Sequence, residues 1–184
     1  MSVRDIVKGN FVKWMDMADE DDDIVISSRI RLARNLRNVP FPHLLDGDRG
    51  MRCIQDIKNA WQAGDYKLKS LDLLTFDQTT ALERQVLVEK HMSSPQHAAS
   101  NAPFRAIMTD AESTLAVMVN EEDHLRIQCL VPGLRLQQAY SEAQTIDDLF
   151  ESHLDYAYDE RRGYLTACPT NVGTGMRASV MMHL

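Results

Sequence analysis

FRAIMTDAESTLAVMVNEEDHLRIQCLV, residues 104–131, contains three short apolar segments in succession. They are FRAIMT (104–109), TLAVMVN (114–120) and HLRIQCLV (124–131), and each has the length and composition of a strand. The four-residue link DAES between the first two suits a β-hairpin. Because consecutive strands with short links pair side by side, this region predicts a largely antiparallel sheet.

Helices are expected on either side of this region. Apolar residues recur at helical spacing in residues 3–18, 48–62, 77–92 (with Asp77 as N-cap) and 135–157. Further strands are predicted at residues 24–32 and 177–184, with a loop at residues 93–103. The fold class is therefore α+β, a largely antiparallel β-sheet flanked by helices. Residues 1–22 are expected to form an N-terminal helix and an acidic linker that continues through DEDDD, residues 19–23.

The composition excludes several classes of protein. The 184 residues suffice for one domain, and 44% hydrophobic and 26% charged residues are ordinary for a soluble globular protein. No apolar run approaches the roughly 20 residues that span a bilayer, and the N-terminus has no signal-peptide core. A net charge of −7 argues against nucleic-acid binding. The widely spaced Cys53, Cys129 and Cys168 predict a reducing, cytoplasmic location.

A basic cluster stands out in this acidic chain. DIVISSRIRLAR, residues 23–34, alternates Ile30 and Leu32 with Arg29 and Arg31, so both arginines share one face of the predicted strand. Guanidinium groups match phosphate oxygens bidentately and stay charged at physiological pH, which favours an anion-binding role. On spacing alone, two surface arginines paired with carboxylates remain an alternative.

Two other segments could carry chemistry. NEEDHLR (120–126) places consecutive carboxylates between two strands, where one could act as a general base; an exposed acidic turn is the alternative, and HExxH zinc spacing is absent. CPTNVGTGMRASV (168–180) offers a glycine loop that an anion could approach, with Arg177 as counter-charge. In this loop Cys168 could equally fill the core. His91 could stack on a base or cap its helix.

Together, SSRIRLARN, VNEEDHLRIQ and CPTNVGTGMRASV resemble the phosphagen kinase superfamily in order and approximate spacing. The resemblance covers residues 23–184 and is closest to the bacterial branch that phosphorylates arginine side chains of proteins; EKHMSSP (89–95) and residues 159–184 also match that branch. It implies a glutamine synthetase-like catalytic domain. Residues 23–184 would be its N-terminal portion, incomplete at the C-terminus, because the family carries a second catalytic glutamate and another phosphate-binding arginine downstream. These residues alone are therefore expected to be weakly active or inactive.

The resemblance also implies roles for individual residues. ATP is expected to be lined by the following residues: Ser27, Ser28, Arg29, Ile30, Arg31, His91, Arg126, Arg177, Ala178, Ser179, Val180 and Met181. Glu122 matches the family's catalytic glutamate with Glu121 beside it, and Cys168 matches a cysteine near the reacting guanidinium. Mg²⁺ is expected mainly on the nucleotide phosphates, with no metal site made by protein side chains.

The expected substrates are proteins bearing exposed arginines. Only 26 residues precede Ser27, which leaves no room for the helical domain that closes over a free amino acid in small-guanidine kinases; those kinases also often carry a histidine where this chain has Met181. The resemblance further implies an activator protein, proteolytic machinery and a stress-response setting, is compatible with a homodimer, and implies no nucleic acid or membrane partner. A kinase of a free guanidino compound and a non-catalytic nucleotide-binding regulatory module are the alternatives.

Overall fold

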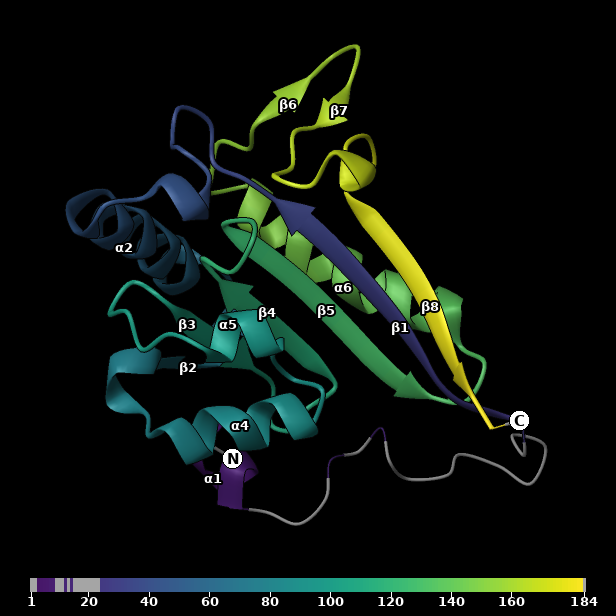
Figure 1. Cartoon of the computed structure of the whole chain (residues 1–184). Helices are drawn as coiled ribbons and strands as arrows, with labels where there is room; N and C mark the ends of the chain where they lie inside the picture. The colour runs from purple at the N-terminus through teal and green to yellow at the C-terminus, as the bar shows by residue number, and fades with distance from the viewer. Residues whose placement is uncertain (1–2, 9–11, 13, 15–23, 184) are drawn as a thin grey trace.

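The computed structural model describes residues 3–8, 12, 14 and 24–183, and the acidic run at residues 19–23 lies outside them. Its centre is a six-stranded sheet with the order β2-β3-β4-β5-β1-β8, antiparallel at every pairing (Figure 1). The strands are β1 Val25–Arg34, β2 Asp72–Thr75, β3 Ala106–Thr109, β4 Leu115–Val119, β5 Leu125–Pro132 and β8 Met176–Met182. The antiparallel sheet is thus confirmed, and β2 adds a strand that the sequence did not predict.

The helices and the smaller elements surround this sheet. The α-helices are α1 Val3–Lys8, α2 Gly47–Ala63, α3 Tyr66–Lys69, α4 Ala81–Glu89, α5 Pro95–Ala98 and α6 Leu136–Glu151. The 3₁₀ turns are η2 Pro42–Leu44, η3 Phe76–Gln78 and η4 Pro169–Asn171, and β6 Tyr158–Asp159 pairs with β7 Gly163–Tyr164 in a separate hairpin. In the described part of the chain, no helix is long and apolar enough to cross a membrane.

Two helices begin or end differently from the prediction. The helix expected at residues 77–92 begins at Ala81, because Thr80 caps it and Glu83 completes a capping box, while Asp77 lies in η3. The helix expected at residues 135–157 ends at Glu151. The chain then turns back toward the end of β1, and the Ala157 amide donates to the carbonyl of Asn35, the residue after β1, at 2.7 Å.

The loop predicted at residues 93–103 needs correction, whereas the helix predicted at residues 3–18 is tested only in part. Of the helix expected at residues 3–18, the structure describes a helix only at Val3–Lys8, with most of the remainder outside the described residues. The loop expected at residues 93–103 contains the short α5, because Ser94 accepts from the His97 amide as N-cap and Pro95 occupies the first turn.

The two faces of the sheet are covered unequally. Ile30 and Leu32 of β1 are buried in the main core with residues of α2 and α6, and Figure 1 shows α6 running behind β5, β1 and β8. On the opposite face, Leu87 of α4 packs on Ile107 of β3, so α4 covers β2–β4. The opposite face of β5, β1 and β8 carries the arginines, and Trp14 packs with Leu130 of β5 on it. The alternation predicted for residues 23–34 is therefore confirmed.

Candidate active site

Four arginines converge on the face of β5, β1 and β8 that is opposite α6. Arg31 of β1 lies directly opposite Arg177 of β8, and Ala33 of β1 lies opposite Arg126 of β5. Directly opposed residues of antiparallel strands project to the same face, and Arg29 shares that face because it is two residues from Arg31. The strand register thus collects guanidinium groups from three segments that are far apart in sequence.

This concentration of positive charge is electrostatically unfavourable without an anion. Burial first, and then the guanidiniums of Arg29, Arg126 and Arg177, lower the pKa of Arg31 to about 10, while Glu121 opposes the shift. Burial and then Arg177 and Arg126 likewise lower the pKa of Arg29. Each shift disfavours the charged form of a group that is nearly always protonated. The site therefore favours a ligand that carries several negative charges.

The contacts of Arg29 and Arg31 test the alternative that these are surface arginines paired with carboxylates. Within the described ranges, neither side chain forms an ion pair with a carboxylate. Arg29 Nε donates to Ser179 Oγ at 3.3 Å, and Arg31 Nε is buried without a hydrogen-bond partner among the same residues. Buried donors are normally satisfied, so the unpartnered Nε fits an anionic ligand. The alternative is therefore wrong for these two arginines.

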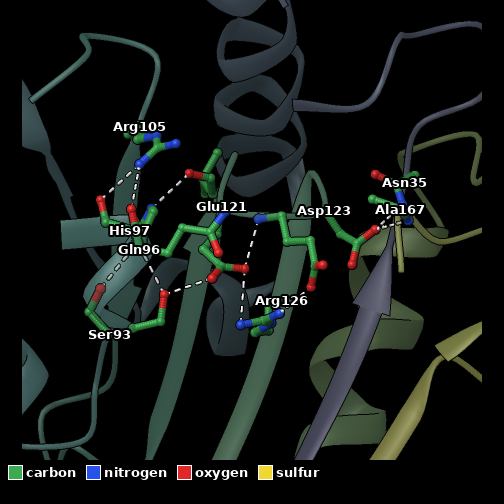
Figure 2. A network of polar contacts seen from close by, with 12 residues as sticks. Asn35, Ser93, Gln96, His97, Arg105, Glu121, Asp123, Arg126 and Ala167 are labelled. Carbon is green, nitrogen blue, oxygen red and sulfur yellow. Dashed lines mark hydrogen bonds and ion pairs between the residues drawn. The ribbon is translucent and has the colours of Figure 1, made fainter. Parts of the chain in front are cut away.

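The β4–β5 turn presents two glutamates with different surroundings. The Glu121 side chain is 3% exposed and accepts from Ser94 Oγ at 2.6 Å, from Arg126 Nη1 at 2.9 Å and from the Glu122 amide at 2.7 Å (Figure 2). Glu122 is 35% exposed and accepts only from Arg126 Nη2, at 3.0 Å, among the described residues. Glu121 is thus committed to holding Arg126, whereas Glu122 remains accessible to a substrate. An exposed acidic turn is wrong for Glu121 and for the buried Asp123.

Two adjoining cavities share Arg31 and Arg126. The smaller, of about 90 Å³, is lined by Arg31, Ala33, Glu122, Arg126, Cys168, Thr170, Asn171, Gly175 and Arg177. The larger, of about 310 Å³, is lined by Arg29, Arg31, Val88, His91, Ser93, Ser94, Pro95, Met118, Arg126 and Gln128. The smaller cavity therefore combines a carboxylate, a thiol and guanidinium groups. The larger cavity combines guanidinium groups with the segment that follows α4.

The strand residues predicted to line ATP divide between the two faces of the sheet. Ser27, Arg29 and Arg31 share the arginine face with Arg177, Ser179 and Met181, as the β1–β8 register requires. The side chains of Ser28, Ile30, Ala178 and Val180 project from the other face. Ile30 is in the main core, and Ser28 Oγ donates to the Gly133 carbonyl at 2.7 Å. For these four residues only the backbone can contact a ligand on the arginine face. The prediction that they line ATP therefore concerns their backbone atoms and not their side chains.

His91 lines the larger cavity with Arg29 and Arg31. It follows α4 with a φ of 59° and its ring meets the edge of Trp14, with ring centroids 5.0 Å apart. Gln128 of β5 donates to the His91 carbonyl at 2.6 Å. Burial and then Arg29 lower the pKa of His91, so the ring is neutral beside the larger cavity.

The glycine loop has a structural role, because Gly175 allows β8 to begin close beside β1. Gly175 has a φ of 62°, and a Cβ there would collide with the Ala33 carbonyl and the Arg34 side chain. This close approach lets the Gly175 carbonyl accept from the Ala33 amide at 2.8 Å, which fixes the start of β8 beside β1. Cys168, in the same loop, lies in the smaller cavity with its Sγ 2.9 Å from Thr170 Oγ1, so it does not fill the core. No three metal-ligating His, Cys, Asp or Glu side chains cluster within the described part.

This geometry agrees with comparisons against known proteins. The family model of the ATP:guanido phosphotransferase C-terminal catalytic domain matches residues 52–184. The chain belongs to this family. Among curated proteins, it is 53% identical to the protein-arginine kinase of Syntrophomonas wolfei over 100% of this chain and 52% of the relative. It is 46% identical to that of Halalkalibacterium halodurans, over 100% and 51%. The chain therefore spans about half the length of these relatives.

Solved structures show the same fold. The taurocyamine kinase of Schistosoma mansoni superimposes with a TM-score of 0.79 at 24% identity, over 96% of this chain and 25% of that one. A lombricine kinase superimposes with a TM-score of 0.76 at 22% identity, over 99% and 57%. At these identities the likeness establishes the phosphotransferase fold alone.

Sequence reasoning missed several residues of this candidate site. Ser94 holds Glu121 and Gln128 holds the His91 backbone. Asn35, which follows β1, and Asp123 in the β4–β5 turn are joined by a buried hydrogen bond of 2.6 Å. Ser94 directly precedes Pro95, a helix-start signal that could have drawn attention to it. Nothing in the local sequence distinguishes Asn35 or Gln128 from exposed polar residues.

Proposed function

We propose that the chain carries the greater part of the active site of an ATP-dependent kinase. This kinase phosphorylates the guanidinium group of arginine residues in proteins. The observation that carries this proposal is the smaller cavity, where Glu122 faces Arg31, Arg126 and Arg177. A carboxylate can hold a substrate guanidinium while the arginines hold the phosphoryl group that it attacks. The names of the curated relatives support the same reaction.

ATP is assigned to the larger cavity, with its phosphates on the arginines. Arg31 and Arg126 line both cavities and would contact the phosphates nearest the acceptor, while Arg29 and His91 line only the larger one. Fixed guanidiniums stabilise the charge that develops on the transferring phosphoryl group without reorganising. Mg²⁺ is assigned to the phosphates of the nucleotide, where it would neutralise further charge.

Glu122 is the residue proposed to activate the acceptor. A guanidinium is a poor nucleophile because its pKa exceeds about 12, so it must lose a proton as it attacks. Glu122 accepts that proton, one guanidinium nitrogen forms the P–N bond, and the bond between the γ-phosphorus and the bridging oxygen breaks to release ADP. Alignment of the reacting atoms can supply on the order of 7–11 kcal/mol of the barrier.

Protein substrates are favoured over free guanidino compounds by the names of the relatives at 42–53% identity. A cytoplasmic location is proposed because all three cysteines are free thiols. The activator protein, the proteolytic machinery and the homodimer stay predictions from the family resemblance.

The deciding experiment incubates the whole protein with ATP and a folded protein substrate, with free arginine as a parallel acceptor. Mass spectrometry is expected to locate acid-labile phosphate on arginine residues of the protein. Glu122→Gln is expected to abolish transfer while ATP binding is largely kept. Acid-stable phosphate on serine or threonine would overturn the proposal, and transfer to free arginine alone would favour the free-guanidine alternative. Binding of ATP without any transfer would favour the regulatory module.

A further inference from the structure

Three segments that carry candidate catalytic groups meet at two buried polar residues. Asn35 directly follows β1, and Asp123 lies in the β4–β5 turn beside Glu122. Asp123 Oδ1 accepts from Asn35 Nδ2 at 2.6 Å and from the Ala167 amide at 2.7 Å, one residue before Cys168. Figure 2 shows Asp123 turned away from Glu121 toward Asn35 and Ala167.

Asn35 also contacts the turn and the loop directly. Its amide nitrogen donates to the Leu165 carbonyl at 3.0 Å, and its Oδ1 accepts from the His124 amide at 3.0 Å. Asn35 is 2% exposed and Asp123 is fully buried, so water does not compete for these bonds. Every one of them crosses between segments that the chain does not join locally.

We propose that Asn35 and Asp123 are positioning residues that hold the Cys168 loop against the Glu122 turn. The catalytic meaning rests on the proposed kinase function, but the structural claim does not. The two bonds to Asp123 set the distance between the backbone beside Glu122 and the backbone beside Cys168, and both of those side chains line the smaller cavity. Because a misplacement of about 1 Å can be costly to catalysis, a rigid link here is a functional requirement.

The different exposure of the three cysteines allows this link to be tested by measuring how fast each thiol is alkylated. Cys168 is partly exposed, whereas Cys53 and Cys129 are each only 1% exposed. Because Cys168 lies in the smaller cavity, iodoacetamide is expected to reach it faster when the loop opens, and to reach the other two cysteines only on global unfolding. Alkylation rates are measured on the 184-residue chain by mass spectrometry of the three cysteine-containing peptides.

Asn35→Ala is the first variant. It removes the donor to Asp123 and the contacts to Leu165 and His124, so loop opening becomes easier. The Cys168 alkylation rate is expected to rise about tenfold or more, because the variant loses three buried hydrogen bonds. Cys53 and Cys129 are expected to stay protected. Asn59→Ala, on the exposed side of α2, is the matched control and is expected to leave all three rates unchanged.

Substitutions of Asp123 distinguish the effect of losing its hydrogen bonds from the effect of losing its charge. Both bonds use Oδ1, and the buried Oδ2 has no partner among the residues that the structure describes. Asp123→Asn can keep both bonds through its amide oxygen, a weaker acceptor than the carboxylate, so its Cys168 rate is expected within about twofold of the wild type. Asp123→Ala is expected to behave like Asn35→Ala.

Two outcomes would overturn the proposal. Unchanged Cys168 rates in both alanine variants would show that the loop is held without Asn35 and Asp123. Parallel increases at Cys53 and Cys129 would show that the pair supports the whole fold and not this loop. Neither measurement uses ATP, so a failure of the kinase assay leaves the result interpretable. In a chain that has kinase activity, Asn35→Ala is also expected to lower kcat with little change in KM for ATP.

Discussion

Arginines three residues apart in one strand have unrelated roles. Arg31 lies on the arginine face, whereas Arg34 projects to the opposite face and is buried against Asp147, with Nη2 and Oδ2 2.6 Å apart. Its guanidinium carbon lies 3.6 Å from the centre of the Tyr164 ring. Burial raises the pKa of Asp147, and Arg34 opposes that rise. Arg34 therefore stabilises the fold, and a buried charge would be left uncompensated without it.

Arg34→Met is expected to lower the free energy of unfolding by about 3–5 kcal/mol, because it leaves Asp147 buried without its ion-pair partner. Arg34→Met combined with Asp147→Leu is expected to recover most of that loss. Arg37→Met is the matched control: the Arg37–Asp155 pair is 48% and 74% exposed, so its loss is expected to cost less than about 1 kcal/mol. Urea denaturation measures all three. Equal losses at Arg34 and Arg37 would contradict the assignment.

Among the secondary elements, α5 is joined to the sheet through one buried histidine. His97 Nε2 lies 3.0 Å from the Val119 carbonyl of β4 and Nδ1 lies 3.0 Å from Ser93 Oγ, so a neutral ring donates to the first and accepts from the second (Figure 2). Burial lowers the pKa of His97 to about 3, and Arg105 and Arg126 contribute to the decrease. Protonation of His97 would remove the acceptor that holds Ser93, next to the serine that binds Glu121.

This histidine predicts a loss of stability in mild acid. Its pKa is about 6.5 in the unfolded chain. Below that pH the unfolded state binds a proton that the folded state does not, so stability falls as the pH decreases toward about 3. Near pH 5, His97 contributes about 1.4 kcal/mol per pH unit to the slope of the free energy of unfolding against pH. His97→Gln is expected to reduce the slope by that amount.

Urea unfolding of this variant at pH 7, 6 and 5 gives the slope. The exposed His153→Gln serves as control and is expected to keep the wild-type slope. His124, whose pKa burial lowers to about 4, retains its own contribution in both variants. A His97→Gln slope equal to that of the wild type would contradict the neutral buried ring.

In the molecule as a whole, patterns within one element were predictable and relations between elements were not. The alternation of residues 23–34 predicted the shared face of Arg29 and Arg31, because strand periodicity is local. Thr80 and Asp77 are equally good caps in the sequence, and only the Glu83 side chain decides between them. The alignment of the arginines across three strands and the Asn35–Asp123 bond depend on register and burial, which no local pattern records. The site is therefore a property of the assembled sheet.

The assembled arginine face predicts that polyanions stabilise the whole chain. Its guanidiniums repel one another within a protein of net charge −7, so tripolyphosphate or ATP should bind the folded state and raise Tm. At a ligand concentration of 100 times Kd, the expected gain is about 2.7 kcal/mol, and added salt should reduce it.

Arg31→Gln tests the origin of this stabilisation. It should weaken polyanion binding by about 10- to 100-fold, the effect of losing a charged hydrogen bond. Without ligand its Tm should not fall, because the change relieves repulsion and the burial of a charge. Arg52→Gln, on the exposed side of α2, should keep the wild-type response. Thermal unfolding with and without tripolyphosphate measures each variant. A lower Tm for ligand-free Arg31→Gln, with an undiminished shift on adding tripolyphosphate, would show that Arg31 stabilises the fold and does not hold phosphate.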